Sequence, residues 1–372
     1  MVSNESGSFE LTFLGCAGGP LNDHTQSFLL KQAGCDAPGY ICIDAGSGLS
    51  EIADMLYNTG ESGSGVVKSL YKNRTEDVST LVAPGISCKS GFGTLSKRFA
   101  EKTDNRGSNV IERAYEIYGE ITEYFITHPH LDHLVGLILN SPAIYERPGC
   151  YKKIYGTEQT VTAIRENLFN DKIWPDFTAD RAIRLKSLDC FKAMKLSTIK
   201  DIECIPFTLR HGYSVRNTDP VFSTAYLFRD CTTNDHILIF GDTESDEVSK
   251  SDSLMKIWEH LSKNVPIRNL KAIVIECSNP EEVETEKLYG HMSPRFIIWE
   301  LLRLVQLYGA GDSMDPSEFE LHVILTHIKD GFTDEDPRTK VLRQLRNLYQ
   351  KSELNKFNID FSIAVPGFTL TL

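Results

Sequence analysis

Three histidines and an aspartate crowd into the segment Thr127-His-Pro-His-Leu-Asp-His133, in a chain of 372 residues with only 10 histidines. The segment lies between the strand-like run Tyr124–Thr127 and the apolar run Leu134–Leu139. Because a chain that leaves a strand stays extended, His128 and His130 project to the same side. Asp132 and His133 lie in the turn that follows and can face a second metal position. Imidazole and carboxylate groups bind Zn²⁺, Mn²⁺ and Fe²⁺, so the segment predicts half of a two-metal site. The ligands expected from it are His128, His130, Asp132 and His133.

A two-metal site needs more ligands from elsewhere in the chain, and strand ends are rigid places to hold them. Three polar residues stand where apolar, strand-like runs stop, namely His211, Asp242 and His327. Taken alone, either histidine is better interpreted as a hydrogen-bonded residue at a sheet edge. Beside the segment 127–133, a metal-ligating role is favoured for all three.

Alternating apolar residues and short turns predict a chain in which strands dominate and helices punctuate them. Strands are expected at residues 9–14, 27–30, 40–44, 124–127, 153–155, 203–208, 223–228, 236–241, 271–276, 321–326 and 359–364. Helices are expected at residues 49–57, 108–121, 161–168, 254–262, 294–308 and 339–349. We expect one α/β domain over residues 1–372. Within it, the polar segment 58–107 is interpreted as an insertion or lid, with a solvated surface loop as the alternative.

Charge and cysteine usage limit the partners and the compartment. The chain has 39 Lys and Arg against 51 Asp and Glu, a formal net charge of −12. This charge repels nucleic acids and anionic membrane surfaces, so neither is expected as a partner. The sequence has no apolar run long enough to span a bilayer and no signal-peptide pattern. The nine cysteines are scattered without a C-x-x-C pair, which suits a reducing compartment and predicts a cytoplasmic protein.

The ligand order His-x-His-x-Asp-His, lone His, strand-terminal Asp and lone His resembles the metallo-β-lactamase superfamily. The resemblance implies an αββα sandwich, in which two mixed sheets pack face to face with helices outside. It also implies that Asp44, after the run Tyr40–Ile43, orients the metal ligands from behind, as carboxylates commonly do for histidine ligands. By the same resemblance one metal ion is held by His128, His130 and His211, the other by Asp132, His133 and His327, and Asp242 bridges both.

Five segments carry a narrower resemblance: Thr127–His133, Asn140–Tyr145, Ile173–Asp176, Ile275–Ser278 and Leu288–Pro294. They are similar to the class II cyclic nucleotide phosphodiesterases, most closely to their fungal low-affinity cyclic AMP members. The resemblance implies an enzyme that hydrolyses 3′,5′-cyclic AMP, with cyclic GMP as a second candidate substrate, to the 5′-monophosphate. A hydroxide held between two divalent metal ions would be the nucleophile. Zinc is expected from the histidine-rich ligand set, with Mn²⁺ or Mg²⁺ as substitutes.

The leaving oxygen needs a proton, and His291 is the expected acid. It lies in a loop just before an amphipathic helix, and Glu276 at the end of an apolar run can accept a hydrogen bond from its imidazole. A metal contact and a helix-capping role are the alternatives for this histidine. The expected catalytic residues are therefore His291, Glu276 and Asp132.

Substrate contacts beyond the phosphate are less constrained by the sequence. Asn140 and Ser141 follow the metal motif closely enough to touch ribose or phosphate, and Trp174 and other aromatic residues such as Tyr145 offer rings for stacking on a purine. Their alternatives are a helix stop and a packed surface corner. The apolar residues of the segment 58–107, Val66, Val67, Leu70 and Tyr71, suggest packing on a second subunit in a homodimer.

Three other functions fit parts of the pattern. A tRNA 3′-end-processing endonuclease would use the same metals, but the acidic charge of the chain opposes a polyanionic substrate. A thioester or lactam hydrolase of the glyoxalase or lactamase kind usually has a shorter chain, with no counterpart to the segment Tyr289–His291. A non-catalytic scaffold would be expected to lose ligands, whereas all seven ligand positions carry coordinating side chains.

Overall fold

The computed structural model describes residues 7–58, 65–71, 74–95, 109–145, 151–216, 218–309 and 315–372. Within these ranges the strands form two large sheets and a separate hairpin. The first sheet has the order β6-β17-β1-β2-β3-β7-β8-β9, with β1 (Phe9–Gly15), β2 (Ser27–Gln32), β3 (Tyr40–Ile43), β6 (Ser87–Ser90), β7 (Ile121–Phe125), β8 (Lys152–Gly156), β9 (Ile183–Ser187) and β17 (Phe368–Thr371).

The second sheet has the order β10-β11-β12-β13-β14-β15-β16. Its strands are β10 (Met194–Lys195), β11 (Ile202–Tyr213), β12 (Pro220–Asp230), β13 (His236–Phe240), β14 (Leu270–Glu276), β15 (Glu320–Thr326) and β16 (Asn358–Ile363). Both sheets are mixed. In the first, β3, β7, β8 and β9 run parallel, and in the second β13 to β16 do so, while the remaining neighbours are antiparallel.

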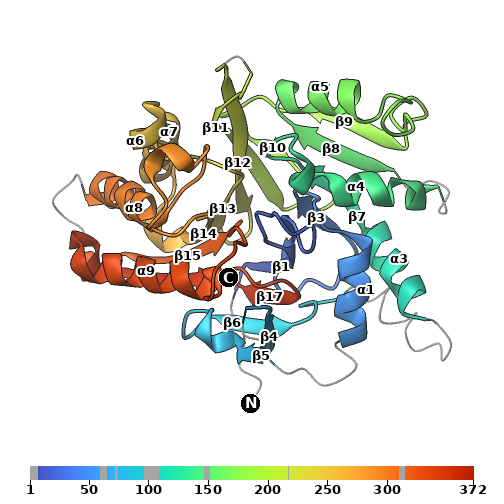
Figure 1. Ribbon diagram of the computed structural model, residues 1–372. Helices are drawn as coiled ribbons and strands as arrows, with labels where there is room; N and C mark the ends of the chain where they lie inside the picture. Colours follow the sequence, from blue (N-terminus) through green and yellow to red (C-terminus); the bar gives the residue numbers. More distant parts are fainter. Residues whose placement is uncertain are drawn as a thin grey trace.

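Helices cover the outer face of each sheet, so that the molecule has four layers (Figure 1). The first sheet is flanked by α1 (Leu49–Asn58), α3 (Val110–Glu120), α4 (Val135–Asn140) and α5 (Glu158–Asn167). The second is flanked by α6 (Asp246–Ser249), α7 (Ser253–Asn264), α8 (Pro294–Gly309) and α9 (Pro337–Lys351). Short 3₁₀ turns lie at Val78–Thr80, Leu131–His133, Ser141–Ile144, Ile267–Asn269, Thr285–Lys287, Pro316–Glu318 and Glu353–Lys356.

Side-chain alternation along the strands explains why the sheets stack. In β13, Ile237 and Ile239 point into the core between the two sheets, whereas Leu238 and Phe240 point toward the helices of the second sheet. In β1, Phe9 enters the same inter-sheet core. Strands buried on both faces have no polar face to show to water, and the continuous apolar run of β13 reflects this. The expected two-sheet sandwich with outer helices is confirmed.

One expected boundary is wrong in a way that matters for the site. The strand expected at 124–127 is β7, which begins directly after α3 at Ile121 and ends at Phe125. Thr127 has left the sheet, because its backbone N–H donates to the Asp44 carboxylate (2.8 Å). The metal motif therefore starts beyond the sheet edge, on backbone held by a side chain.

The segment 58–107 is described only in part, and residues 59–64, 72–73 and 96–107 lie outside the described ranges. The described part holds the hairpin of β4 (Val66–Ser69) and β5 (Arg74–Asp77), as well as β6, which pairs with β17 at the edge of the first sheet. Its role as a lid stays a prediction.

The apolar patch expected to form a homodimer contact is only partly exposed. Val67 is buried in the core beneath the second sheet, and the Tyr71 hydroxyl donates to Asp330 (2.7 Å). Val66 and Leu70 remain exposed. The homodimer itself stays a prediction. None of the helices in the described ranges combines the length and apolar character that a bilayer crossing requires.

Candidate metal centre

Strand ends from both sheets converge on one region. In the second sheet, the parallel strands β13, β14 and β15 finish side by side, with Asp242 just after β13, Glu276 ending β14 and His327 just after β15. In the first sheet, β3 and β7 are also parallel, and they lead into Asp44 and the segment 127–133. Because the carboxyl ends of parallel strands share an edge, residues far apart in sequence meet there.

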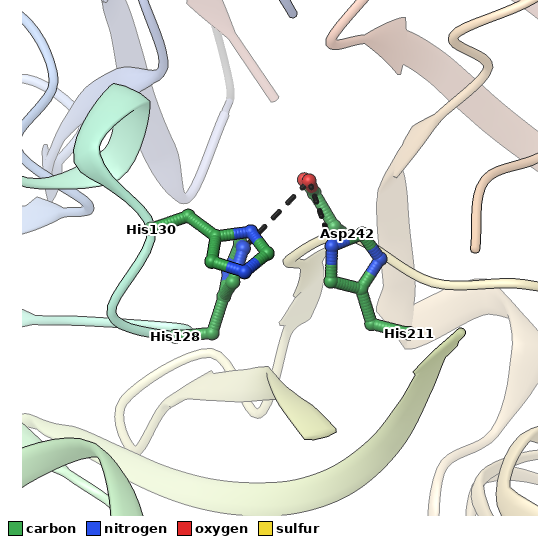
Figure 2. A group of neighbouring side chains, drawn as sticks. All are labelled: His128, His130, His211 and Asp242. Atoms are coloured by element: carbon green, nitrogen blue, oxygen red, sulfur yellow. Dashed lines mark ion pairs between the residues drawn. The ribbon is translucent and has the colours of Figure 1, made fainter. Parts of the chain in front are cut away.

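The first group of ligand atoms belongs to His128, His130, His211 and Asp242, and these atoms all lie within 4.8 Å of one another. Figure 2 shows Asp242 facing His128 and His211, with His130 beside His128. The Asp242 Oδ2 lies 3.8 Å from His128 Nε2 and 3.6 Å from His211 Nε2. His211 sits at an irregularity in the β11–β12 pairing, and such bulges commonly re-aim a side chain toward a site.

The second group consists of Asp132, His133, Asp242 and His327. His133 Nε2 and His327 Nε2 are 3.3 Å apart, and both lie close to the other oxygen of Asp242, at 3.3 and 3.4 Å from Oδ1. The Asp132 carboxylate is 3.2 Å from His327 Nε2. Asp242 thus presents one carboxylate oxygen to each group.

These residues fit divalent metal ions. His128 Nε2 and Asp242 Oδ1 are buried, and neither has a hydrogen-bond partner among the described residues. Buried polar atoms are costly without a partner, and a cation between them would supply one. Burial lowers the pKa of His128 well below its usual value and that of His211 to about 4, so both imidazoles are neutral and can donate a lone pair.

Other side chains fix which nitrogen faces the ions. His211 Nδ1 donates to the Gly290 carbonyl (2.9 Å), and His133 Nδ1 lies 2.7 Å from Asp44 Oδ2. Both histidines are thereby left with Nε2 toward the cluster, the arrangement that hydrogen bonds from the far nitrogen enforce in metal sites.

Asp44 is fully buried, and its carboxylate lies behind His133 of the second group. Its carboxylate accepts hydrogen bonds from Thr127 (backbone N 2.8 Å) and from Gln26 (3.1 Å). It adopts a left-handed backbone conformation (φ 54°), unusual for a residue other than glycine. Burial works against a proton on His133, yet the Asp242 and Asp44 carboxylates outweigh it and raise the pKa of His133. The same negative charge favours a metal cation at the opposite nitrogen.

Glu276 and His291 pair beside the metal groups. His291 Nδ1 lies 2.8 Å from Glu276 Oε1, and the second carboxylate oxygen accepts from the Ser278 hydroxyl. Burial alone would lower the pKa of His291, but the Glu276 charge raises it. His291 Nδ1 is also 3.8 Å from Asp242 Oδ2, so this pair borders the first group directly. A cationic imidazole is therefore favoured next to the ligands.

The residues expected to touch substrate, Asn140, Ser141 and Trp174, make hydrogen bonds within the protein. Asn140 Oδ1 accepts from the backbone N of Leu49 (2.8 Å) at the start of α1. The Ser141 hydroxyl donates to the Ile138 carbonyl (2.7 Å) and accepts from Trp174 Nε1 (2.9 Å). Ser141 is fully buried. These bonds favour the packing interpretation for Ser141 and for the indole N–H of Trp174.

Sequence reasoning missed Ser278. Its buried hydroxyl lies 3.3 Å from His291 Nδ1 and 3.0 Å from His327 Nδ1, so it joins the Glu276 pair to the second metal group. The signal available was its place two residues after Glu276 in a segment already noted for resemblance. Ser278 lies two residues beyond the end of β14, so a search for polar residues at strand ends did not identify it.

Comparisons with known proteins agree with this geometry. A family model described as cAMP phosphodiesterases class-II matches residues 42–367. The 3′,5′-cyclic-nucleotide phosphodiesterase 1 of Saccharomyces cerevisiae is 38% identical over 376 aligned residues, covering 98% of this chain and 99% of that protein. The 3′,5′-cyclic-nucleotide phosphodiesterase of Candida albicans is 28% identical, covering 98% and 99%.

Solved structures give the same picture. The crystal structure of unliganded yeast PDE1 matches with a TM-score of 0.89 and 36% identity, covering 98% of this chain and all of that one (100%). The metallo-β-lactamase fold protein YhfI from Bacillus subtilis matches with a TM-score of 0.51 and 14% identity, covering 97% and 98% of the two chains. The latter likeness shows the fold alone, and it confirms the expected metallo-β-lactamase architecture.

Proposed function

The chain belongs to the class II cAMP phosphodiesterase family, and we propose from this that it hydrolyses 3′,5′-cyclic AMP to 5′-AMP, with cyclic GMP as a second substrate. The observation that carries the proposal is the pair of ligand groups that share Asp242. Besides Asp242, the first group contains three histidines that come from both sheets, and the second contains two histidines and Asp132. A phosphodiester anion needs concentrated positive charge to accept a nucleophile, and such a centre can provide it.

We propose two divalent ions per chain, one in each group, with zinc as the native metal. Histidine-rich, partly carboxylate ligand sets of this kind suit Zn²⁺, although Mn²⁺ can use them as well. When bound, two such ions neutralise phosphate charge and lower the pKa of water so that hydroxide is available near neutral pH.

The chain's own residues would orient and complete the reaction. Water attacks phosphorus, the bond from phosphorus to O3′ breaks, and the departing O3′ takes a proton. His291 is the proposed proton donor. Glu276, 2.8 Å from its Nδ1, favours the charged imidazole, and Asp242, 3.8 Å from the same atom, shows that His291 lies beside the metal ligands. Asp132, 33% exposed on its side chain, lies on the open side of the second group.

Asp44 and Ser278 would act through the ligands. Asp44 holds the Nδ1 side of His133, and Ser278 contacts the Nδ1 side of His327. Fixing these rings keeps both Nε2 atoms directed at the shared carboxylate. The scattered cysteines support the cytoplasm as the compartment in which the enzyme acts.

The test measures metal content per chain by elemental analysis and, on the same sample, the release of 5′-AMP from cyclic AMP before and after chelation. We expect two ions per chain and a release that stops with the chelator and returns when Zn²⁺ is added. Two ions without release would keep the centre and refute the substrate. Folded protein that binds no metal would refute the centre. Cleavage of precursor tRNA in a parallel assay would favour the endonuclease alternative.

A further inference from the structure

Two tyrosines stand one glycine away from histidines of the site. The chain reads His211-Gly212-Tyr213 at the end of β11 and Tyr289-Gly290-His291 before α8. The first histidine belongs to a metal group, and the second pairs with Glu276. The centroids of the two histidine rings are 4.8 Å apart, so each tyrosine is two residues away from a histidine of the same small cluster.

The two glycines let these segments cross in close contact. A Cβ on Gly212 would come within 3.0 Å of the Gly290 Cα, and a Cβ on Gly290 within 2.8 Å of the Gly212 backbone N. Both glycines also have positive φ, 69° and 87°, which other residues rarely adopt. The His211 Nδ1 bond to the Gly290 carbonyl (2.9 Å) fastens the crossing. A Cβ on Gly212 would also lie 3.5 Å from the Tyr289 carbonyl carbon, so each tyrosine is attached directly to a glycine of the crossing.

Both tyrosines are exposed despite their position next to buried histidines. Tyr213 is 56% exposed and Tyr289 is 77% exposed, and neither hydroxyl makes a hydrogen bond with the described residues. A single exposed aromatic residue is ordinary in a folded protein. Two exposed tyrosines next to one crossing of the chain are less common. Tyr289 also has a left-handed backbone (φ 51°), a conformation that costs free energy and is concentrated at binding sites.

The aromatic residues that the sequence suggested for base stacking are engaged elsewhere. Trp174 is tied to Ser141, and the Tyr145 ring packs against Phe177 with centroids 5.1 Å apart. Tyr213 also has a ring partner, since the Arg210 guanidinium lies 4.9 Å from its ring centroid, and this contact limits the orientations of the ring. The open side of the site is also nearby, because the exposed His130 ring lies 5.1 Å from His211.

We propose that Tyr213 and Tyr289 form the base-binding part of the site and stack on the purine of the cyclic nucleotide. The inference rests on the proposed function, since it assumes that the phosphate lies at the metal centre. A purine presents a broad π-face that suits two aromatic side chains, and stacking of this kind tolerates either adenine or guanine. The tyrosines therefore set affinity for the nucleoside and leave the reacting phosphate to the metal ligands.

The experiment compares Tyr213→Ala and Tyr289→Ala with the ring-preserving variants Tyr213→Phe and Tyr289→Phe. Each alanine variant should raise the KM for cyclic AMP by about tenfold with little change in kcat, in line with the usual cost of losing a base–aromatic stack. Each phenylalanine variant should stay close to the wild type. Metal content should remain unchanged in all four. Tyr57→Ala, an exposed tyrosine (58%) on α1, serves as the matched control.

Unchanged KM in both alanine variants, or equal loss in the phenylalanine and alanine variants, would overturn the inference. Failure of the proposed function is separable, because it appears in the wild type as absent cyclic AMP hydrolysis. In that event, calorimetric binding of 5′-AMP and ribose 5-phosphate to the wild type decides the tyrosine site. Equal affinities for the two ligands would refute a base-binding role. Tighter binding of 5′-AMP that the alanine variants lose would support it.

Discussion

Asp242 belongs to both groups of candidate metal ligands. Its two carboxylate oxygens face different groups of histidines, and it is almost fully buried. Burial opposes the charged form of Asp242, yet the neighbouring His327 and His133 outweigh it and hold the pKa of Asp242 well below its usual value. A bound cation would add a further partner for this carboxylate, so replacement of Asp242 tests metal binding.

Asp242→Ala should lose bound metal from both groups and abolish hydrolysis, because no other described carboxylate touches both. Elemental analysis and 5′-AMP release on the same preparation check this. A far-ultraviolet circular dichroism spectrum equal to that of the wild type is the folding control. A variant that keeps two ions per chain would contradict the bridging assignment.

Asp44→Asn tests the residue behind the ligands. The amide keeps the shape but removes the charge that holds His133 Nδ1 at 2.7 Å, and partners of this kind are worth about 10–100-fold in metal affinity or activity. A titration with a competing chelator measures the loss. Asp54→Asn, an exposed aspartate on α1, is the matched control and should match the wild type.

His291→Ala should reduce kcat by about 10²–10⁴-fold and keep both metal ions, since general acids contribute on that scale and its Nδ1 is committed to Glu276. Steady-state kinetics together with elemental analysis give the two readouts. Loss of one ion per chain would instead make this histidine a ligand and leave the proton donor to be found elsewhere.

Among the elements, β15 is part of the core of the second sheet and also leads directly into the candidate metal ligand His327. It ends next to His327 and lies between β14 and β16, with which it pairs in parallel. Near its start, His322 is buried and its Nε2 lies 2.7 Å from the Ser362 hydroxyl on β16. Burial lowers the pKa of His322 to about 4, so this histidine is neutral in the folded protein at neutral pH.

This lowered pKa predicts acid sensitivity in β15. The unfolded chain takes up a proton at His322 below about pH 6.5 while the folded chain resists it to about pH 4, so stability is complete above pH 6.5 and declines as the pH falls toward 4. Between pH 7 and pH 5 the wild type should lose about 2 kcal/mol more of its free energy of unfolding than His322→Gln. Urea unfolding of both proteins at the two pH values, with chelator present throughout, measures the difference. Parallel declines in the two proteins would contradict the prediction.

At the scale of the whole molecule, the ligands come from both layers of the sandwich. The segment 127–133 extends from the first sheet, whereas His211, Asp242 and His327 extend from the second. Bound ions would thus link the two sheets across their shared core. Ligands that bind only the folded state stabilise it, by about 2.7 kcal/mol at a hundredfold excess over Kd.

Removal of metal should therefore lower the melting temperature of the wild type by several degrees. Differential scanning calorimetry with and without a chelator checks this, and Asp242→Ala provides the control, since its transition should not respond to the chelator. A wild-type transition that is insensitive to the chelator would mean that the ions do not stabilise the sandwich.

Local patterns predicted the metal residues because each is polar where an apolar strand stops, and parallel strands bring such ends together. Asp242 and His327 are of this kind, whereas Asp44 was expected from the superfamily resemblance, behind the ligands. The contacts of Ser278 and the close approach of Gly212 to Gly290 could not be predicted from the sequence, because they depend on which loops cross and how closely. For Trp174 the sequence left stacking and packing open, and the hydrogen bond of its indole N–H to Ser141 favours packing.

The place of β17 has a consequence for synthesis. This strand inserts between β6 and β1, although it is made more than 350 residues after β1 begins. At about 5–20 residues per second, a ribosome needs roughly 20–70 seconds to deliver it. During that time β1 has one open edge, whose unpaired N–H and C=O groups can join any passing strand. The nascent chain therefore depends on protection of that edge until its last strand arrives.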